Sequence, residues 1–92
     1  MDLMTLRTEI DAIDRDLIAL LEKRMDVAAE IASYKQANGL PVLDASREAD
    51  KLASIRAMCR PETAELLPDV FRAVMAASRA RQEKLLEERH GG

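Results

Sequence analysis

Apolar residues recur along the first third of the chain with alternating steps of four and three positions. The series consists of Leu6, Ile10, Ile13, Leu17, Leu20, Val27, Ile31 and Tyr34. This spacing is typical of one apolar stripe on a long amphipathic helix. The stripe is interrupted at position 24, where an apolar residue is expected and Arg24 stands. A guanidinium on such a stripe is costly unless an anion meets it, so Arg24 needs either a carboxylate from another element or a ligand.

Start and stop signals give the bounds of this first helix. Thr5 is a suitable N-cap, and Asn38, Gly39 and Pro41 end the helix, so we expect it over about 5–38. At 1.5 Å per residue it is a rod of roughly 48 Å, whereas a compact domain of this size is roughly 26 Å across. The rod must therefore project beyond its own fold and pack on another chain.

Two shorter helices follow the first one. Asp44 is the predicted N-cap of a helix over about 45–58. The third helix starts either at the good cap Thr63 or closer to Pro68, because proline is comfortable only in a first turn. We take 63–88 as its range. With no strand signal, the chain is predicted to be all-α.

Composition fits a single small domain over residues 1–92. Charged residues make up 34% of the chain, and three glycines and three prolines leave long uninterrupted stretches for helices. The net charge of −3 and the absence of a Lys/Arg run argue against nucleic acid and membrane surfaces as partners. We find no signal peptide and no membrane span, and one Cys with one His argues against a metal site. We therefore expect a cytoplasmic, metal-free protein.

Polar side chains also stand where the helix patterns expect core residues. Lys35 follows Arg24 by eleven residues, about three turns, so the two cations share a face and lie roughly 16 Å apart along the axis. Ser78 replaces an apolar residue in the third helix, and Gln82 lies one turn beyond it. Two cations at this separation could grip opposite ends of a small polyanion.

Asp44 and Glu48 lie one turn apart at the start of the second helix, with Arg47 beside Glu48. The expected inward surfaces thus carry cations, an amide, a hydroxyl and carboxylates, without a nucleophile next to a base. Such a set suits recognition and electrostatic stabilisation better than covalent or metal chemistry. Each residue also has a structural interpretation: a lone Arg24 in a heptad can set pairing specificity, and Asp44 caps its helix in any case.

The joint placement of these residues resembles the all-helical, bacterial-type chorismate mutases over about residues 5–86. The matching segments are Leu6-Arg7-Thr8-Glu9-Ile10-Asp11-Ala12-Ile13-Asp14, Leu20-Leu21-Glu22-Lys23-Arg24, Lys35 before a Gly-Leu-Pro-Val loop, Asp44-Ala-Ser-Arg47-Glu48, and Phe71 through Ser78 to Gln82. The resemblance implies an intertwined homodimer of three-helix chains. It also implies a cofactor-free Claisen rearrangement of chorismate to prephenate in the shikimate pathway, toward Phe and Tyr.

The resemblance implies catalytic roles for Lys35, Gln82 and Arg24. Lys35 and Gln82 hydrogen-bond the ether oxygen whose C–O bond breaks, while Arg24 and Arg7 of the partner subunit bind the two carboxylates of the substrate. The residue spacing agrees, because Arg7 and Arg24 of one helix lie about 25 Å apart along the axis. If both touch one small molecule, they come from different chains.

The remaining substrate-binding residues implied by the resemblance surround the ring. Asp44 and Glu48 hold the ring hydroxyl, while Arg47 and Ser78 complete the polar wall. Two alternatives stay open. One is another enzyme on the same scaffold, such as an isochorismate–pyruvate lyase or an aminodeoxychorismate mutase. The other is a non-catalytic helical dimerisation module, in which the inward cations serve pairing.

Overall fold

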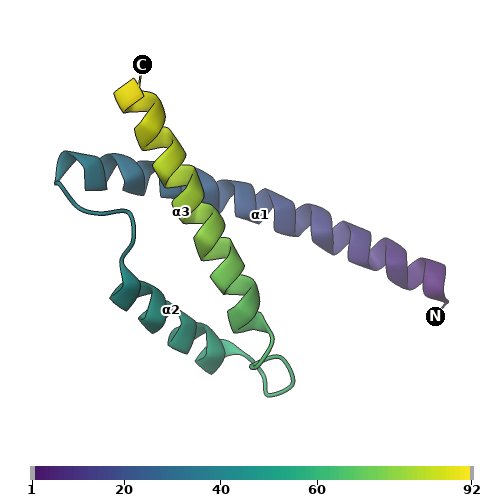
Figure 1. Cartoon of the computed structure of the whole chain (residues 1–92). Helices are drawn as coiled ribbons and strands as arrows, with labels where there is room; N and C mark the ends of the chain where they lie inside the picture. Colours follow the sequence, from purple (N-terminus) through teal and green to yellow (C-terminus); the bar gives the residue numbers. More distant parts are fainter. Residues whose placement is uncertain (1, 92) are drawn as a thin grey trace.

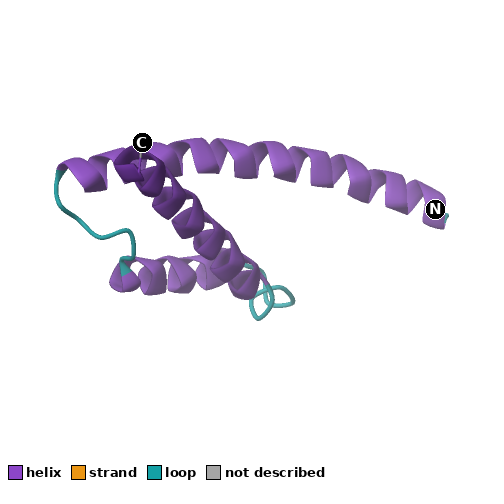
Figure 2. Ribbon diagram, turned by 45° about the horizontal axis from the view of Figure 1, so that its top comes forward, coloured by secondary structure: helices purple, strands orange, loops and turns teal. Residues whose placement is uncertain are grey.

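A computed structural model describes residues 2–91, and this part of the chain forms three helices. They are α1 (Leu3–Ala37), α2 (Ala45–Met58) and α3 (Leu67–Gly91). α3 crosses the C-terminal half of α1 and also packs against α2 (Figure 1). Figure 2 shows the N-terminal half of α1 extending alone beyond the other two helices. None of the described helices has the length and apolar character that crossing a membrane requires.

α1 begins earlier than the sequence pattern indicated. Its N-cap is Asp2, whose Oδ1 accepts a hydrogen bond from the backbone N–H of Thr5 at 2.8 Å. The prediction of Thr5 as the cap is therefore wrong, because a carboxylate three residues upstream already satisfies its N–H. That hydrogen bond lowers the pKa of Asp2. The stabilisation of the helix start by this carboxylate is therefore complete above the ordinary carboxyl pKa and is lost as the pH falls through the lowered pKa.

The other end of α1 and the whole of α2 lie where the sequence places them. α1 ends at Ala37 with Asn38 as its C-cap, and Gly39 follows with a φ of 65°, a conformation that favours glycine. α2 is capped by Asp44, whose Oδ1 accepts from the Arg47 N–H at 3.0 Å.

α3 begins at Leu67, so of the two starts left open, the one close to Pro68 is correct and the one at Thr63 is not. Residues 61–66 form turns instead, in which Thr63 donates its hydroxyl proton to the carbonyl of Arg60. Pro68 then falls in the first turn of α3, where a missing N–H costs nothing. At the other end α3 runs to Gly91 rather than residue 88. Its last turns contact α1, because Arg89 donates to the side-chain oxygen of Gln36 at 3.1 Å.

The buried core lies along α3 and is built from small and flexible side chains. Ala28 and Ala32 of α1, Ile55 of α2 and Met75 of α3 are its buried hydrophobic members, and Ala32 is fully covered. Ala28 and Ala32 are one turn apart, so they present one smooth patch to α3. Small side chains at a crossing let two helices approach closely.

The apolar stripe of α1 does not contribute to this core. All eight of its members are exposed, with exposed fractions from 42% to 65%. The face that packs on α3 lies one position further round the helix, at Ala28 and Ala32 rather than at Val27 and Ile31. The long helix projects as expected: the molecule measures 53 × 29 × 14 Å, with a radius of gyration of 16.6 Å. A compact chain of this length has a radius of about 12 Å.

The α1–α3 crossing generates a first prediction. Ala32→Leu should lower the free energy of unfolding by about 1–3 kcal/mol, because the added methyl groups push α3 away from α1. Denaturant unfolding followed by circular dichroism measures the change. Ala12→Leu, at an exposed position of α1, is the matched control and should change stability by less than about 0.5 kcal/mol. Equal effects of the two variants would contradict the close crossing.

Candidate active site

A cavity of about 270 Å³ opens between the C-terminal half of α1, the loop after it, the first turns of α2 and the middle of α3. Seven of the eight polar residues singled out in the sequence line it. The full lining is Arg24, Ile31, Lys35, Val42, Asp44, Arg47, Glu48, Lys51, Met75, Ser78, Arg79 and Gln82. Polar residues from three helices, separated by up to 58 positions in the chain, thus meet at one place.

Arg24 lies at the α1 wall of the cavity and is half-buried. Within residues 2–91, no carboxylate forms an ion pair with it. Pairing with a carboxylate of α2 or α3 therefore does not explain the presence of Arg24 on the apolar stripe. The guanidinium remains available to an anion in the cavity.

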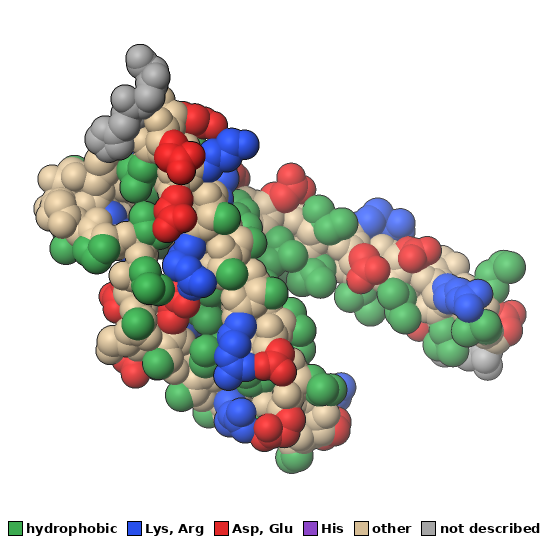
Figure 3. Space-filling view, viewed as in Figure 1, with side chains coloured by type: hydrophobic (Ala, Val, Ile, Leu, Met, Phe, Trp, Pro, Cys, Tyr) green, Lys and Arg blue, Asp and Glu red, His purple; other side chains and the backbone are tan. Residues whose placement is uncertain are grey.

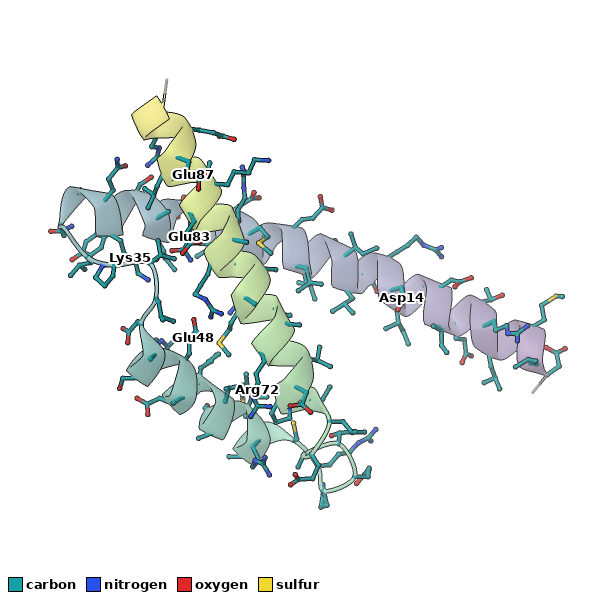
Figure 4. All side chains as sticks on the ribbon, in the orientation of Figure 1. Asp14, Lys35, Glu48, Arg72, Glu83 and Glu87 are labelled. Carbon is teal, nitrogen blue, oxygen red and sulfur yellow. The ribbon has the colours of Figure 1, made fainter. Side chains whose placement is uncertain are left out.

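Lys35 ties the loop to the end of α1. Its Nζ donates a hydrogen bond to the carbonyl oxygen of Val42 at 2.6 Å. An ammonium has three protons, so two remain for a ligand. Figure 4 labels Lys35 near the end of α1 and Glu48 near the start of α2, and the Lys35 contact fixes the loop between these helices to α1 at Val42.

Ser78 and Gln82 form the α3 wall of the cavity and are its most buried polar members, 8% and 5% exposed. Gln82 Nε2 donates to Ser78 Oγ at 3.3 Å, while Gln82 Oε1 is buried without a partner. An unpartnered buried polar atom is costly, and a half-turn of the amide exchanges its oxygen and its amino group without supplying the missing partner. Ser78 then donates to Oε1, and the amino group of Gln82 points to the unpartnered position.

The α2 wall carries both carboxylates of the cavity. Asp44 is exposed and uses one oxygen to cap α2, which leaves its other oxygen free of that duty. Glu48 is half-buried, and both of its oxygens accept hydrogen bonds from Nη1 of Arg79 on α3. This ion pair joins α2 to α3 and holds the Glu48 carboxylate at the cavity wall.

Sequence reasoning missed two cations of the cavity, Lys51 and Arg79. Lys51 lies one turn after Arg47, a spacing that could have revealed it, whereas the contact of Arg79 with Glu48 spans 31 positions and has no local signal. With these two, the lining has five cationic and two anionic side chains, a formal charge of +3. The whole chain carries −3, so positive charge is concentrated at this one site.

Arg7 is the one expected site residue that does not line the cavity. It is exposed on the projecting half of α1. Seventeen residues separate it from Arg24, about 25 Å of helix axis. Arg7 therefore cannot reach the cavity of its own protomer.

Comparison with known proteins gives consistent matches. Residues 6–83 match the family described as chorismate mutase type II. The T-protein of Enterobacter agglomerans is 40% identical over 79 residues, which cover 84% of this chain and 21% of that protein. A chorismate mutase of Methanocaldococcus jannaschii is 28% identical over 88 residues, covering 94% of this chain and 89% of that protein.

A solved structure is also similar. The structure of chorismate mutase (form II) from Thermus thermophilus matches with a TM-score of 0.83 and 30% sequence identity, over 88% of this chain and 93% of that chain. The T-protein relatives are much longer, and this chain spans about a fifth of their length.

Proposed function

Because the chain belongs to the chorismate mutase type II family, we propose that it catalyses the rearrangement of chorismate to prephenate in aromatic amino acid biosynthesis. The observation that carries this proposal is the cavity with a formal charge of +3, lined by both amide and ammonium donors. Chorismate is a small dicarboxylate, and a positive cavity of about 270 Å³ suits such a dianion.

The reaction makes modest chemical demands. Within one molecule a C–O bond breaks and a C–C bond forms, and no group is transferred to or from the protein. The enzyme must hold the compact reactive conformer and stabilise negative charge that develops on the ether oxygen. We assign the second task to Lys35 and Gln82. Lys35 has two free protons, and the amino group of Gln82 can take the unpartnered position in the wall.

The two carboxylates are assigned to arginines from different chains. Arg24 has no carboxylate partner among the described residues of its protomer and is free to bind one of them. Arg7 of the partner subunit binds the other, because its own cavity lies about 25 Å away along the helix. This division of the site requires a homodimer.

The apolar stripe of α1 supports a second copy as the occupant of that surface. Eight large apolar side chains stand exposed in a line on a helix that leaves its own fold, and Figure 3 shows hydrophobic groups along this projecting half. Monomeric proteins rarely expose an apolar surface of this extent. In the proposed intertwined homodimer the stripes of two chains cover each other, which also brings Arg7 to the partner's cavity.

The ring hydroxyl is assigned to the carboxylates of the α2 wall. Asp44 has one oxygen free of its capping bond, and Glu48 is held in place by Arg79 and keeps acceptor capacity beyond that pair. Arg47 and Ser78 complete the wall. Two carboxyl groups at this end offer hydrogen-bond acceptors, which favours a substituent that donates hydrogen bonds.

The direct test is an assay of chorismate disappearance with identification of the product. Prephenate should form without added metal or cofactor, and a bicyclic dicarboxylate that mimics the transition state should inhibit. Release of pyruvate would instead indicate a lyase on this scaffold. Absence of turnover together with a stable dimer would favour a dimerisation module and contradict the proposal.

The cross-subunit site can be tested by mixing two inactive variants. Arg7→Ala and Arg24→Ala homodimers should each lose nearly all activity, whereas the mixed dimer regains one of its two sites, because that site receives both wild-type arginines. The matched control mixes Lys35→Ala with Arg24→Ala chains. Both of these residues line the same protomer's cavity, so no regain is expected. Equal behaviour of the two mixtures in a turnover assay would refute the shared site.

The role of Gln82 predicts a change in pH dependence. An amide donates at any pH, so the parent rate should change little between about pH 5 and 8. A Gln82→Glu carboxyl donates only when protonated, so activity should rise as the pH falls and be lower by about 10²–10³ at pH 8. A parent-like rate of this variant at pH 8 would mean that residue 82 does not face the breaking bond.

A further inference from the structure

Lys51 occupies a position that the proposed catalytic scheme does not use. It is half-buried on α2 and lines the main cavity. It also lines an adjoining cavity of about 230 Å³, which shares Arg24, Ile31, Arg47 and Ser78 with the first. Lys51 lies one turn after Arg47, so the two cations project from the same side of α2. The boundary of the two cavities therefore carries three cations.

The carboxylate best placed to neutralise Lys51 is already engaged. Glu48 lies three residues before Lys51, a spacing at which opposite charges commonly pair. Both oxygens of Glu48 instead accept hydrogen bonds from Arg79 of α3. Across residues 2–91 no carboxylate forms an ion pair with Lys51, Arg24 or Arg47. Three uncompensated cations facing one space are mutually repulsive, and an anion placed between them relieves this repulsion.

The geometry points to Lys51 as a further substrate-binding residue. Its ammonium joins the Arg24 guanidinium in binding the substrate carboxylate assigned to Arg24, while Arg47 beside them keeps its place in the wall around the ring hydroxyl. This inference rests on the proposed function, since it names an additional contact in the same site. A carboxylate is present both before and during the rearrangement, so Lys51 contributes to binding rather than to the chemical step.

Steady-state kinetics of Lys51→Met and Lys51→Gln test this assignment. Both variants remove the positive charge of Lys51, and Lys51→Gln keeps a polar group. KM should rise roughly tenfold with kcat within about twofold of the parent, because the lost contact is a charge-assisted one made equally in ground and transition states. Lys51→Arg should restore KM. Lys84→Met, at an exposed position of α3 that lines neither cavity, should leave both constants unchanged.

Equilibrium binding separates this inference from the proposed function. Calorimetric titration with the bicyclic dicarboxylate should show affinity roughly tenfold weaker for Lys51→Met and Lys51→Gln, and unchanged for Lys84→Met. An active parent with unchanged KM and unchanged affinity in both Lys51 variants would overturn the role of Lys51 and leave the mutase function standing. A parent without turnover would overturn the mutase function, while the titration would still decide whether Lys51 contributes to dicarboxylate binding.

Discussion

The close crossing of α3 over α1 organises the molecule. It occurs at Ala28 and Ala32, which lie between Arg24 and Lys35 along the helix. The two cations therefore flank the crossing, and the buried Gln82 of α3 enters the space that they border. Larger side chains at the two alanines would lift α3 and widen the cavity that all three helices line.

Cations outnumber carboxylates around the cavity, although a folded chain ordinarily pairs the charges that it buries. Arg24 is half-buried, yet no carboxylate of the described residues pairs with it, and such a charge costs free energy in the empty protein. The ion pair of Glu48 with Arg79 ties α2 to α3 and removes a carboxylate that could have neutralised the other cations. Departures of this kind from the best local pairing are typical of binding sites, where the ligand supplies the missing charge.

α1 has two apolar faces, and only one of them is covered within the protomer. Ala28 and Ala32 pack within the protomer, whereas the line from Leu6 to Tyr34 stays exposed. A chain that leaves its largest apolar surface uncovered has only a small core of its own, so its stability is expected to depend on the proposed second copy. In that arrangement folding, assembly and completion of the site are one process, because the same helix carries the dimer surface and Arg7.

Interactions between residues that are close in the sequence determined most of the secondary structure. The 3.6-residue periodicity, the Asp44 cap and the Asn38-Gly39 stop depend on neighbours within a turn or two, so the extent of α2 and the end of α1 could be derived from the sequence. The starts of α1 and α3 were not determined in this way. Asp2 and Thr5 can both act as caps of α1, Thr63 and Pro68 both suit the beginning of α3, and only the folded chain selects between them.

The sequence identified most residues of the site but not the contacts between them. Seven of its polar residues stood out because they interrupt apolar patterns or share one helix turn. Lys51 was overlooked although it lies one turn after Arg47. Arg79 gave no local signal, because polar residues on an amphipathic helix look alike until a neighbouring helix covers one of them. The tertiary structure alone decided that Glu48 pairs with Arg79, 31 residues away, and that Ala28 and Ala32, rather than Val27 and Ile31, meet α3. Helix pairing depends on the rotation of each helix about its axis, and a periodic pattern with two apolar faces leaves that rotation undetermined.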